Sequence, residues 1–234
     1  MMETATAESS HSLITLRQRL AERLGKGFGV ACSGVDGDPQ RLYPEEFEAV
    51  RKAVPRRQRE FSAGRQAARQ AMMDIGWSPM AIPSAADRSP VWPEGLVGSI
   101  SHTRQWCVAV VCPTHLVRGI GIDMEHDQPM GPELWDTICT PEEHAWVATQ
   151  AASLQGLWVT RLFSAKEAYF KWQYPQTGQM LEFQDVQVVI NTQTMSFDIH
   201  PASVKRTRMR AHRRPGQFLV SDEHLLAWVV EPGI

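Results

Sequence analysis

Three β-type runs follow one another between Val97 and Ile122, and they lie between two long helical segments. The runs read VGSISH, WCVAVVC and VRGIGI, and Thr, Pro and Gly residues separate them. Helical patterns occupy 13–24, 44–75 and about 132–172, and the chain closes with strand-like runs and a hairpin. Helices and strands therefore occur in each half, which predicts an α+β fold.

Proline and glycine predict several boundaries within this pattern. Pro55 divides 44–75 into two helices, and the second is expected to end at Gly76. The sequence from Thr140 to Glu143 (TPEE) predicts a helix start, and the last long helix is expected to end before Pro175. No internal repeat is visible. We expect two α+β lobes, 1–118 and 119–234, that meet near Gly119.

Composition excludes several classes of protein. With 234 residues, 43% of them hydrophobic and 21% charged, the chain is an ordinary globular protein. The net charge of −2 argues against a surface that binds nucleic acid throughout. Four scattered cysteines indicate free thiols in a reducing compartment, and no run is apolar enough to span a membrane. We expect a cytoplasmic monomer without a nucleic-acid or membrane partner.

Two acids stand where an apolar strand ends, in the sequence GIGIDMEHD (119–127). Side chains two apart share a face of a strand, so Asp123 and Glu125 project together while Ile122 and Met124 point the other way. Neighbouring carboxylates repel unless a cation or a proton lies between them, and Mg²⁺ suits such a pair. A solvated strand end is the alternative interpretation.

The segment FSAKEAYFK (163–171) places Phe163, Glu167 and Lys171 on one stripe of a helix. Glu167 could complete a metal site with the two strand acids, and Lys171 could bind a phosphate or protonate a departing oxygen. An exposed Glu–Lys helix pair is the alternative. Lys166 faces elsewhere on the helix and ranks below both.

A Ser-His pair ends the run VGSISH. Ser101 and His102 are expected on opposite sides of a strand, which argues against a hydrolase dyad, and no Gly-x-Ser-x-Gly elbow occurs. His102 could donate to a phosphate, and a structural histidine is the alternative.

Arginines are concentrated upstream of that pair. Arg57, Arg65 and Arg69 recur along one helical segment, and Arg88 lies in a Pro-bounded loop. Guanidinium groups match phosphate oxygens, although basic helix faces are usually only solvated.

Taken together and in this order, these motifs resemble the 4′-phosphopantetheinyl transferases, in particular the enterobactin synthetase component D type. The match covers roughly 57–185. It comprises the Arg-rich helix with Gly64-Arg65, Arg88-x-Pro with Trp92-Pro93, Gly98-Ser-Ile-Ser-His102, Gly121-Ile-Asp-x-Glu125 and Phe-Ser-Ala-Lys166-Glu167-Ala-x-x-Lys171.

The resemblance implies a pseudo-twofold pair of lobes, with the nucleotide side in the first and the metal site and catalytic helix in the second. It implies transfer of the 4′-phosphopantetheine arm of coenzyme A to a serine of an apo carrier protein. Asp123, Glu125 and Glu167 would bind Mg²⁺, with Mn²⁺ as an alternative. Glu167 and Lys171 would be catalytic, and either Glu167 or a metal-bound water would be the base that activates the carrier serine. The implied coenzyme A ligands are Arg57, Arg65, Arg88, Ser101, His102, Asp123, Glu167, Lys171 and, lining the pocket, Leu181.

Two departures from the family pattern are visible. Phe163 stands where many members have Trp, which agrees with the enterobactin subtype, and Met124 stands where some relatives have a polar residue. An outward-facing thioether cannot coordinate a hard cation.

Two rival functions use part of the same features. A Mg²⁺-dependent nuclease, or another phosphoryl-transfer enzyme, would also use acids and a lysine, and the run KRTRMRAHRR (205–214) could follow a nucleic-acid backbone. A binding module could use that run to dock an acidic partner without any metal. For a transferase, the same run is a candidate surface for docking an acidic carrier, with a solvated hairpin as the alternative.

Overall fold

The computed structural model describes residues 2–202, 214–221 and 223–233, with backbone alone for 2–11. Two compact units make up the fold: one holds the residues up to Arg118 and those from Pro232 on, and the other is Gly119–Glu231. The predicted second lobe, 119–234, includes the chain's end, whereas the residues from Pro232 on belong to the first unit. They belong there because the Gly233 N–H donates a 2.8 Å hydrogen bond to the Leu116 carbonyl.

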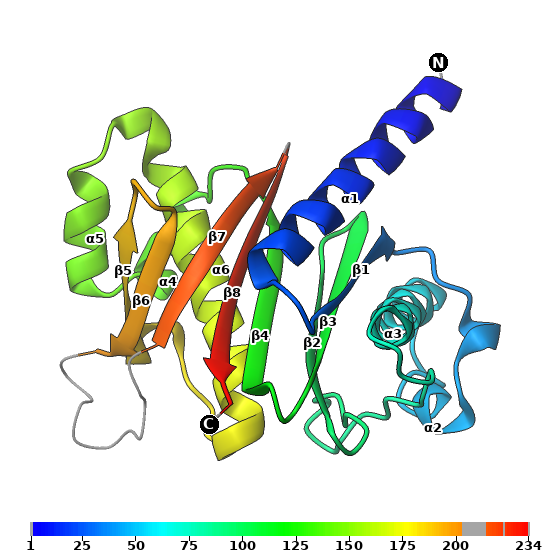
Figure 1. Cartoon of the computed structure of the whole chain (residues 1–234). Helices are drawn as coiled ribbons and strands as arrows, with labels where there is room; N and C mark the ends of the chain where they lie inside the picture. Colours follow the sequence, from blue (N-terminus) through cyan, green and yellow to red (C-terminus); the bar gives the residue numbers. More distant parts are fainter. Residues whose placement is uncertain (1, 203–213, 222, 234) are drawn as a thin grey trace. The chain divides into compact units, whose positions relative to one another are not determined.

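A three-stranded antiparallel sheet forms the first unit (Figure 1). Its strands are β1 (Gly29–Gly34), β3 (Trp106–Pro113) and β2 (Leu96–His102), in that order. The central strand β3 is buried because its run from Cys107 to Cys112 is uniformly small and apolar.

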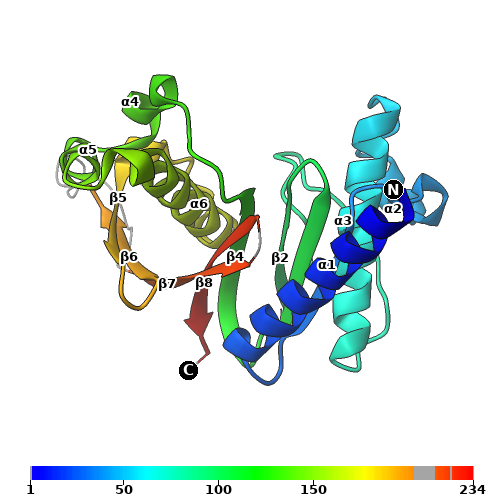
Figure 2. The same cartoon turned by 90° about the horizontal axis from the view of Figure 1, so that it is seen from above.

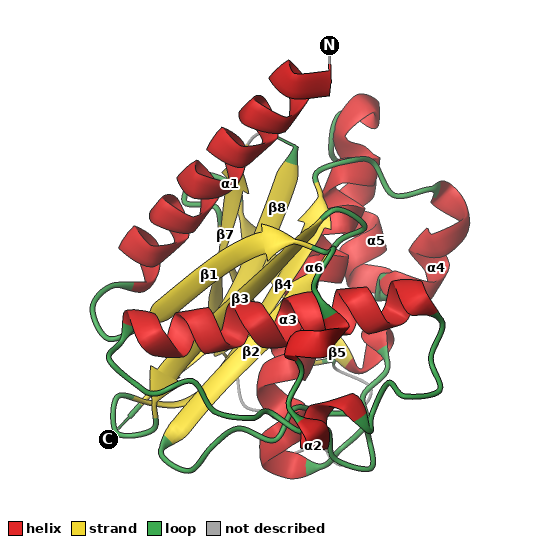
Figure 3. Cartoon of the chain, turned by 90° about the vertical axis from the view of Figure 1, so that its right-hand side faces the viewer, coloured by secondary structure: helices red, strands yellow, loops and turns green. Residues whose placement is uncertain are grey.

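Helices α1 (Met2–Leu24), α2 (Pro44–Phe47) and α3 (Pro55–Asp74) complete this unit, with a short helix η1 (Pro39–Arg41). As predicted, Pro55 begins a new helix. Helix α3 runs across the three strands (Figure 3). It approaches closely because its buried face is rich in alanine, and a Cβ on Gly29 would lie 1.8 Å from the Ala71 carbonyl oxygen.

The second unit contains a five-stranded sheet in the order β4-β8-β7-β6-β5. The strands are β4 (Val117–His126, whose first two residues fall in the first unit), β5 (Val186–Asn191), β6 (Ser196–Pro201), β7 (Arg214–Ser221) and β8 (His224–Pro232). Strands β7 and β8 pair as the expected terminal hairpin.

The helices of the second unit are η2 (Pro132–Leu134), α4 (Trp135–Ile138), α5 (Pro141–Ala148), α6 (Ala152–Thr177) and η3 (Phe183–Asp185). Helix α6 lies along the inner side of the sheet, as Figure 2 shows. Its apolar face, from Trp158 to Trp172, packs with the inward side chains of β5 to β8 to form the core.

Helix α6 does not end before Pro175, which corrects the boundary predicted from the sequence. Pro175 lies inside the helix, which ends at Thr177 and is capped by Gly178 in the left-handed conformation with φ 64°. Proline lacks the N–H that would bond the Lys171 carbonyl, and in the last turn this loss concerns a single hydrogen bond.

A short motif occurs in both units, although the sequence shows no repeat along its length. Pro44-Glu45-Glu46 begins α2 and Pro141-Glu142-Glu143 begins α5. In each case the last glutamate is buried and pairs with a base 23 residues later, Arg69 at 2.6 Å and Lys166 at 2.6 Å. Three identical residues and one basic residue 23 positions later are too few for a sequence comparison to detect as a repeat.

Within the described residues, no helix combines the length and apolar character that crossing a membrane requires.

Candidate active site

Strand β4 carries both acids on the side that faces α6. Gly121 lies on this side, since a Cβ there would lie 1.9 Å from the Ala168 carbonyl oxygen of α6. Asp123 and Glu125 follow at intervals of two and therefore share that side. Ile122 and Met124 are fully buried on the other side, so the alternation predicted from the sequence is confirmed.

Asp123 is held by two donors from α6. Its Oδ1 accepts a hydrogen bond from Lys171 Nζ at 2.7 Å, and its Oδ2 accepts one from Ser164 Oγ at 2.9 Å. Asp123 is 3% exposed, whereas the side chain of Lys171 is 27% exposed. The lysine thus neutralises a buried acid while its head group stays accessible.

Glu125 and Glu167 extend this acidic cluster. Burial raises the pKa of Glu125 to about 7, with further upward effects from Asp123 and Glu167, while Lys171 acts in the opposite direction. Burial also raises the pKa of Glu167. The charge of Asp123 raises this pKa further, whereas the charge of Lys171 acts to lower it. Three carboxylates and one lysine carry an excess of negative charge, which favours a bound cation or proton.

The donor set fits a hard divalent cation, because carboxylate oxygens are the side-chain ligands that Mg²⁺ prefers. The described part of the chain nevertheless contains no group of three His, Cys, Asp or Glu side chains arranged to hold a metal. Both oxygens of Asp123 accept hydrogen bonds from α6 instead. The set of Asp123, Glu125 and Glu167 therefore stays a prediction.

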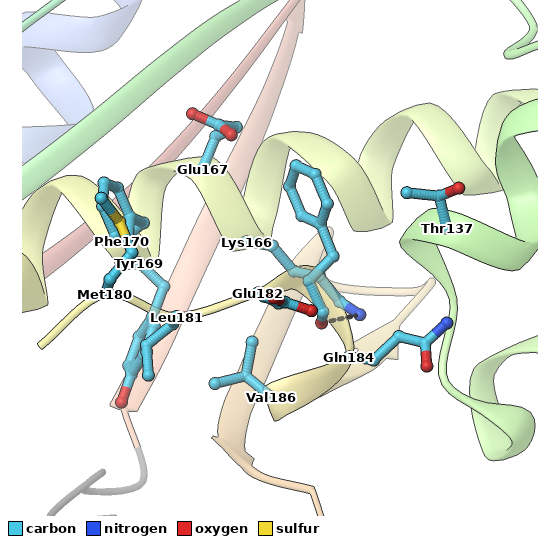
Figure 4. A pocket seen from close by; sticks show the side chains of 11 residues that line it. Thr137, Lys166, Glu167, Tyr169, Phe170, Met180, Leu181, Glu182, Gln184 and Val186 are labelled. Atoms are coloured by element: carbon cyan, nitrogen blue, oxygen red, sulfur yellow. Dashed lines mark hydrogen bonds between the residues drawn. The ribbon is translucent and has the colours of Figure 1, made fainter.

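A cavity of about 570 Å³ adjoins Glu167 within the second unit. Apolar side chains dominate its walls, and Figure 4 shows most of them. The lining residues are Thr137, Lys166, Glu167, Tyr169, Phe170, Met180, Leu181, Glu182, Phe183, Gln184 and Val186. Leu181 lines this cavity, and its contact with coenzyme A stays a prediction. The sequence did not indicate Phe170, Met180 and Phe183 as lining residues, although the apolar Met180 and Phe183 flank Leu181.

Lys166 leaves α6 on a different side from Glu167 (Figure 4), in agreement with the helical spacing. It is 2% exposed and donates a hydrogen bond to Glu143, so its ammonium group is used within the fold.

The first unit brings Arg57 and His102 together. Arg57 Nη1 lies 3.3 Å from His102 Nε2, and His102 Nδ1 lies 3.0 Å from the Thr103 carbonyl oxygen. A carbonyl only accepts and a guanidinium only donates, so these partners assign the hydrogen to Nδ1. Ser101 is buried and His102 exposed, which confirms that they face opposite sides.

Glu60 borders this pair on α3. It accepts a 2.8 Å hydrogen bond from Arg56 and lies 3.8 Å from Arg57. Partial burial acts to raise its pKa, but the hydrogen bond from Arg56 and the charges of His102, Arg56 and Arg57 outweigh it, so that the pKa is lowered. The exposed bases are thus partly balanced by one acid.

Two helix arginines are buried, which the sequence did not indicate. Arg65 donates to the Ile82 carbonyl at 2.7 Å and to Ser84 Oγ at 3.2 Å, and burial lowers its pKa to about 10. Arg69 pairs with Glu46. Arg65 therefore secures the start of the loop that carries Arg88, and its direct contact with coenzyme A stays a prediction.

Arg88 occupies a tight turn with φ 71°, a left-handed conformation that is uncommon for a residue other than glycine. Its N–H donates to the Ala85 carbonyl at 2.9 Å. Asp87 accepts from both the N–H and the hydroxyl of Ser89, which stabilises the turn.

The basic run 205–214 lies outside the described residues except for Arg214. Arg214 forms an ion pair with Glu231, and its guanidinium lies 4.8 Å from the centre of the Trp172 ring. This arginine is therefore part of the second unit's own packing.

Comparison with protein-family models gives two matches. The 4′-phosphopantetheinyl transferase N-terminal domain matches residues 45–112, and the 4′-phosphopantetheinyl transferase superfamily matches residues 119–227.

Two of the following three relatives are named as 4′-phosphopantetheinyl transferases. The chain is 32% identical to the 4′-phosphopantetheinyl transferase Npt of Nocardia iowensis, over 71% of this chain and 77% of that protein. It is 34% identical to the transferase Svp of Streptomyces mobaraensis over 67% of this chain, but spans only 64% of Svp. Enterobactin synthase component D of Escherichia coli (strain K12) is 33% identical over 68% of this chain and 78% of that protein.

Proposed function

Because the chain belongs to the 4′-phosphopantetheinyl transferase superfamily, we propose that it transfers the 4′-phosphopantetheine group of coenzyme A to a serine of an apo acyl or peptidyl carrier protein. The observation that carries this proposal is the cluster of Asp123, Glu125, Glu167 and Lys171 beside an apolar cavity. The second product would be adenosine 3′,5′-bisphosphate, and the carrier would serve siderophore, polyketide or fatty acid synthesis.

Asp123, Glu125 and Glu167 would hold Mg²⁺, or Mn²⁺ in its place. The ion would offset the negative charge of the coenzyme A pyrophosphate and so favour attack by a nucleophile. The excess of carboxylates over lysine in this cluster supports the proposal.

Glu167 would accept the proton of the carrier serine hydroxyl. Its pKa is raised by burial, which makes the carboxylate a stronger base than an exposed glutamate. The serine oxygen would then form a bond to the β-phosphorus as the bond to the bridging pyrophosphate oxygen breaks. Lys171, with its accessible ammonium group, would stabilise or protonate the departing phosphate oxygen.

The cavity beside Glu167 would take the pantetheine arm. Leu181, Phe170 and Phe183 supply an apolar wall for the methyl and methylene groups. Because Glu167 belongs to both the cavity and the acidic cluster, an arm bound there would place its phosphate end near the acids.

The first unit would bind the nucleotide part. Arg57 presents an exposed guanidinium next to His102, and exposed Arg88 sits in a tight turn. Ser101 and Arg65 are both buried and would stabilise the segments that carry these exposed residues.

Intact mass spectrometry of purified apo carrier proteins tests the proposal. After incubation with coenzyme A, Mg²⁺ and the protein, we expect a carrier to gain the mass of one phosphopantetheine, with release of adenosine 3′,5′-bisphosphate. Excess EDTA should abolish the gain, and added Mg²⁺ should restore it. An unchanged mass across acyl and peptidyl carriers would refute the transferase function.

A further inference from the structure

Lys166 uses its whole ammonium group inside the second unit. Its Nζ donates to the Ile138 carbonyl at 2.7 Å, to Glu143 Oε2 at 2.6 Å and to the Phe183 carbonyl at 2.8 Å. An ammonium has three hydrogens, so each of them has an acceptor. With a side chain that is 1% exposed, Lys166 has neither a donor nor an approach for a substrate phosphate.

Both carboxylate oxygens of Glu143 also accept hydrogen bonds. Its Oε2 also accepts from the Thr140 N–H at 2.8 Å, and its Oε1 accepts from the Val188 N–H at 2.6 Å. The ion pair thus joins the end of α4, the start of α5, helix α6, the Phe183 segment and strand β5.

Two of the segments that this ion pair joins, helix α6 and the segment at Phe183, contribute to the candidate active site. Glu167 follows Lys166 on α6, so fixing Lys166 fixes the rotation and height of the helix at Glu167. Phe183 lines the cavity, and its carbonyl is bound by Lys166, which ties the wall from Leu181 to Gln184 to that helix (Figure 4).

The first unit also contains a buried ion pair, but the residue that follows its basic member is not an acid. Arg69 binds Glu46, which also accepts from the Ile82 N–H at 2.9 Å. The residue after Arg69 is Gln70, whose side chain donates a hydrogen bond to Asp74 Oδ1 at 3.1 Å. The pair is therefore a packing device in both units, and in the second unit it carries the acid and the cavity wall.

We infer that Lys166 and Glu143 are positioning residues that fix Glu167 and the cavity wall at 181–184 relative to each other. The inference rests on the proposed transferase function for its kinetic consequences. It gives Lys166 a purpose other than phosphate contact, and it predicts that the pair matters more for coenzyme A binding and turnover than for stability.

Removing both charges together separates these effects, because replacing a whole buried ion pair is often neutral for stability whereas removing one partner is costly. Lys166→Met alone leaves a buried carboxylate and should destabilise the protein strongly. The double variant Lys166→Met with Glu143→Gln keeps an amide oxygen for the Val188 N–H and should recover most of the stability. Its kcat/KM for coenzyme A should nevertheless fall by about tenfold to a hundredfold, since small misplacements of catalytic groups have effects of this size.

Two further variants complete the test. Lys166→Arg keeps the charge pair, which is arginine–glutamate in the first unit, and should retain more activity than the double variant. Val229→Ala shortens a buried core side chain of the same unit and serves as the control of lowered stability, with unchanged KM well below its melting temperature. A double variant with wild-type kcat and KM would overturn the inference.

Amide hydrogen exchange tests the inference without any activity. Exchange at 179–185 should be faster in the double variant than in wild type or in Val229→Ala. Equal exchange in all three would also overturn the inference. If wild type modifies no carrier, the transferase proposal fails, while the exchange result still decides whether the pair holds the cavity wall.

Discussion

At the scale of single residues, the charge balance around Asp123 governs the candidate active site. One accessible lysine serves a cluster of three acids, and Lys171 already binds the most buried of them at 2.7 Å. A cation that joins the cluster would release Lys171 to act on phosphate oxygens. Asp123 would therefore control both the cation and the lysine.

Asp123→Asn removes the charge and keeps an oxygen acceptor for the Ser164 hydroxyl. We expect transfer to fall by about a hundredfold or more, because the pyrophosphate charge would lose part of its stabilisation. The free energy of unfolding should change by only about 1 kcal/mol, since the partly exposed Lys171 can be solvated. Carrier modification followed by mass and urea unfolding measure the two effects. Asp127→Asn, which removes an acid paired with Arg161, is the matched control, and equal losses in both variants would contradict the assignment.

The thiols give a second prediction at this scale. Burial raises the pKa of Cys112 to about 11, and burial together with the charge of Glu143 raises that of Cys139 to about 11, against the effect of Lys166. At pH 8 only about one thiol in a thousand would be ionised. Iodoacetamide should therefore leave both cysteines unmodified in the folded protein at pH 8 and modify them in urea, as peptide mass mapping can show. Stoichiometric labelling within minutes on the folded protein would be the contrary result.

At the scale of elements, the contact between β4 and α6 sets the distances among the site residues. Asp123 belongs to the strand, and Glu167 and Lys171 belong to the helix, so their separation depends on how closely the two backbones approach. Gly121 permits that approach, because a Cβ at this position would lie 1.9 Å from the Ala168 carbonyl oxygen and 2.5 Å from the Trp172 backbone nitrogen.

Gly121→Ala should therefore push the strand and the helix apart. We expect a loss of about 1–3 kcal/mol in the free energy of unfolding, as for other overpacked sites, together with a marked fall in kcat. Gly119→Ala is the control on the same strand, since its Cβ would first meet the flexible end of Gln176 at 2.8 Å. Chemical denaturation and transfer kinetics of both variants provide the measurement, and a fully active Gly121→Ala protein would show that the contact does not set the site.

At the scale of the whole molecule, the net charge of the protein does not favour association with an acidic carrier protein. The net charge is −2, so electrostatic attraction must come from local groups. Arg214 is already paired with Glu231, which leaves Lys205, Arg206, Arg208, Arg210 and Arg213 as the candidate docking residues of the basic run.

Reversing two of these charges, Arg206→Glu with Arg210→Glu, tests whether the run steers docking. If it does, the association rate with an apo carrier should fall and depend less on salt, while the calorimetric affinity for coenzyme A stays unchanged. Stopped-flow association at two ionic strengths supplies the rates. Rates that respond neither to salt nor to the reversal would leave a hydrophobic surface as the docking site.

The local pattern of the chain determined much of this description. Alternation in GIGIDMEHD predicted that Asp123 and Glu125 face away from Ile122 and Met124, because that property depends only on strand geometry. Helical spacing likewise separated Lys166 from Glu167, and Pro55 and the Thr140 sequence located helix starts. The family followed from motifs in a fixed order.

Only the tertiary structure showed which charged side chains are buried and bonded within the protein. Arg65, Arg69 and Lys166 read as ordinary basic letters, yet each is buried against a carbonyl or a glutamate that lies many residues away. Pro175 was expected to end α6 but lies within its last turn, because the effect of a proline depends on how many hydrogen bonds follow it. Partners distant in sequence are fixed only when the elements pack, so no local pattern could reveal them.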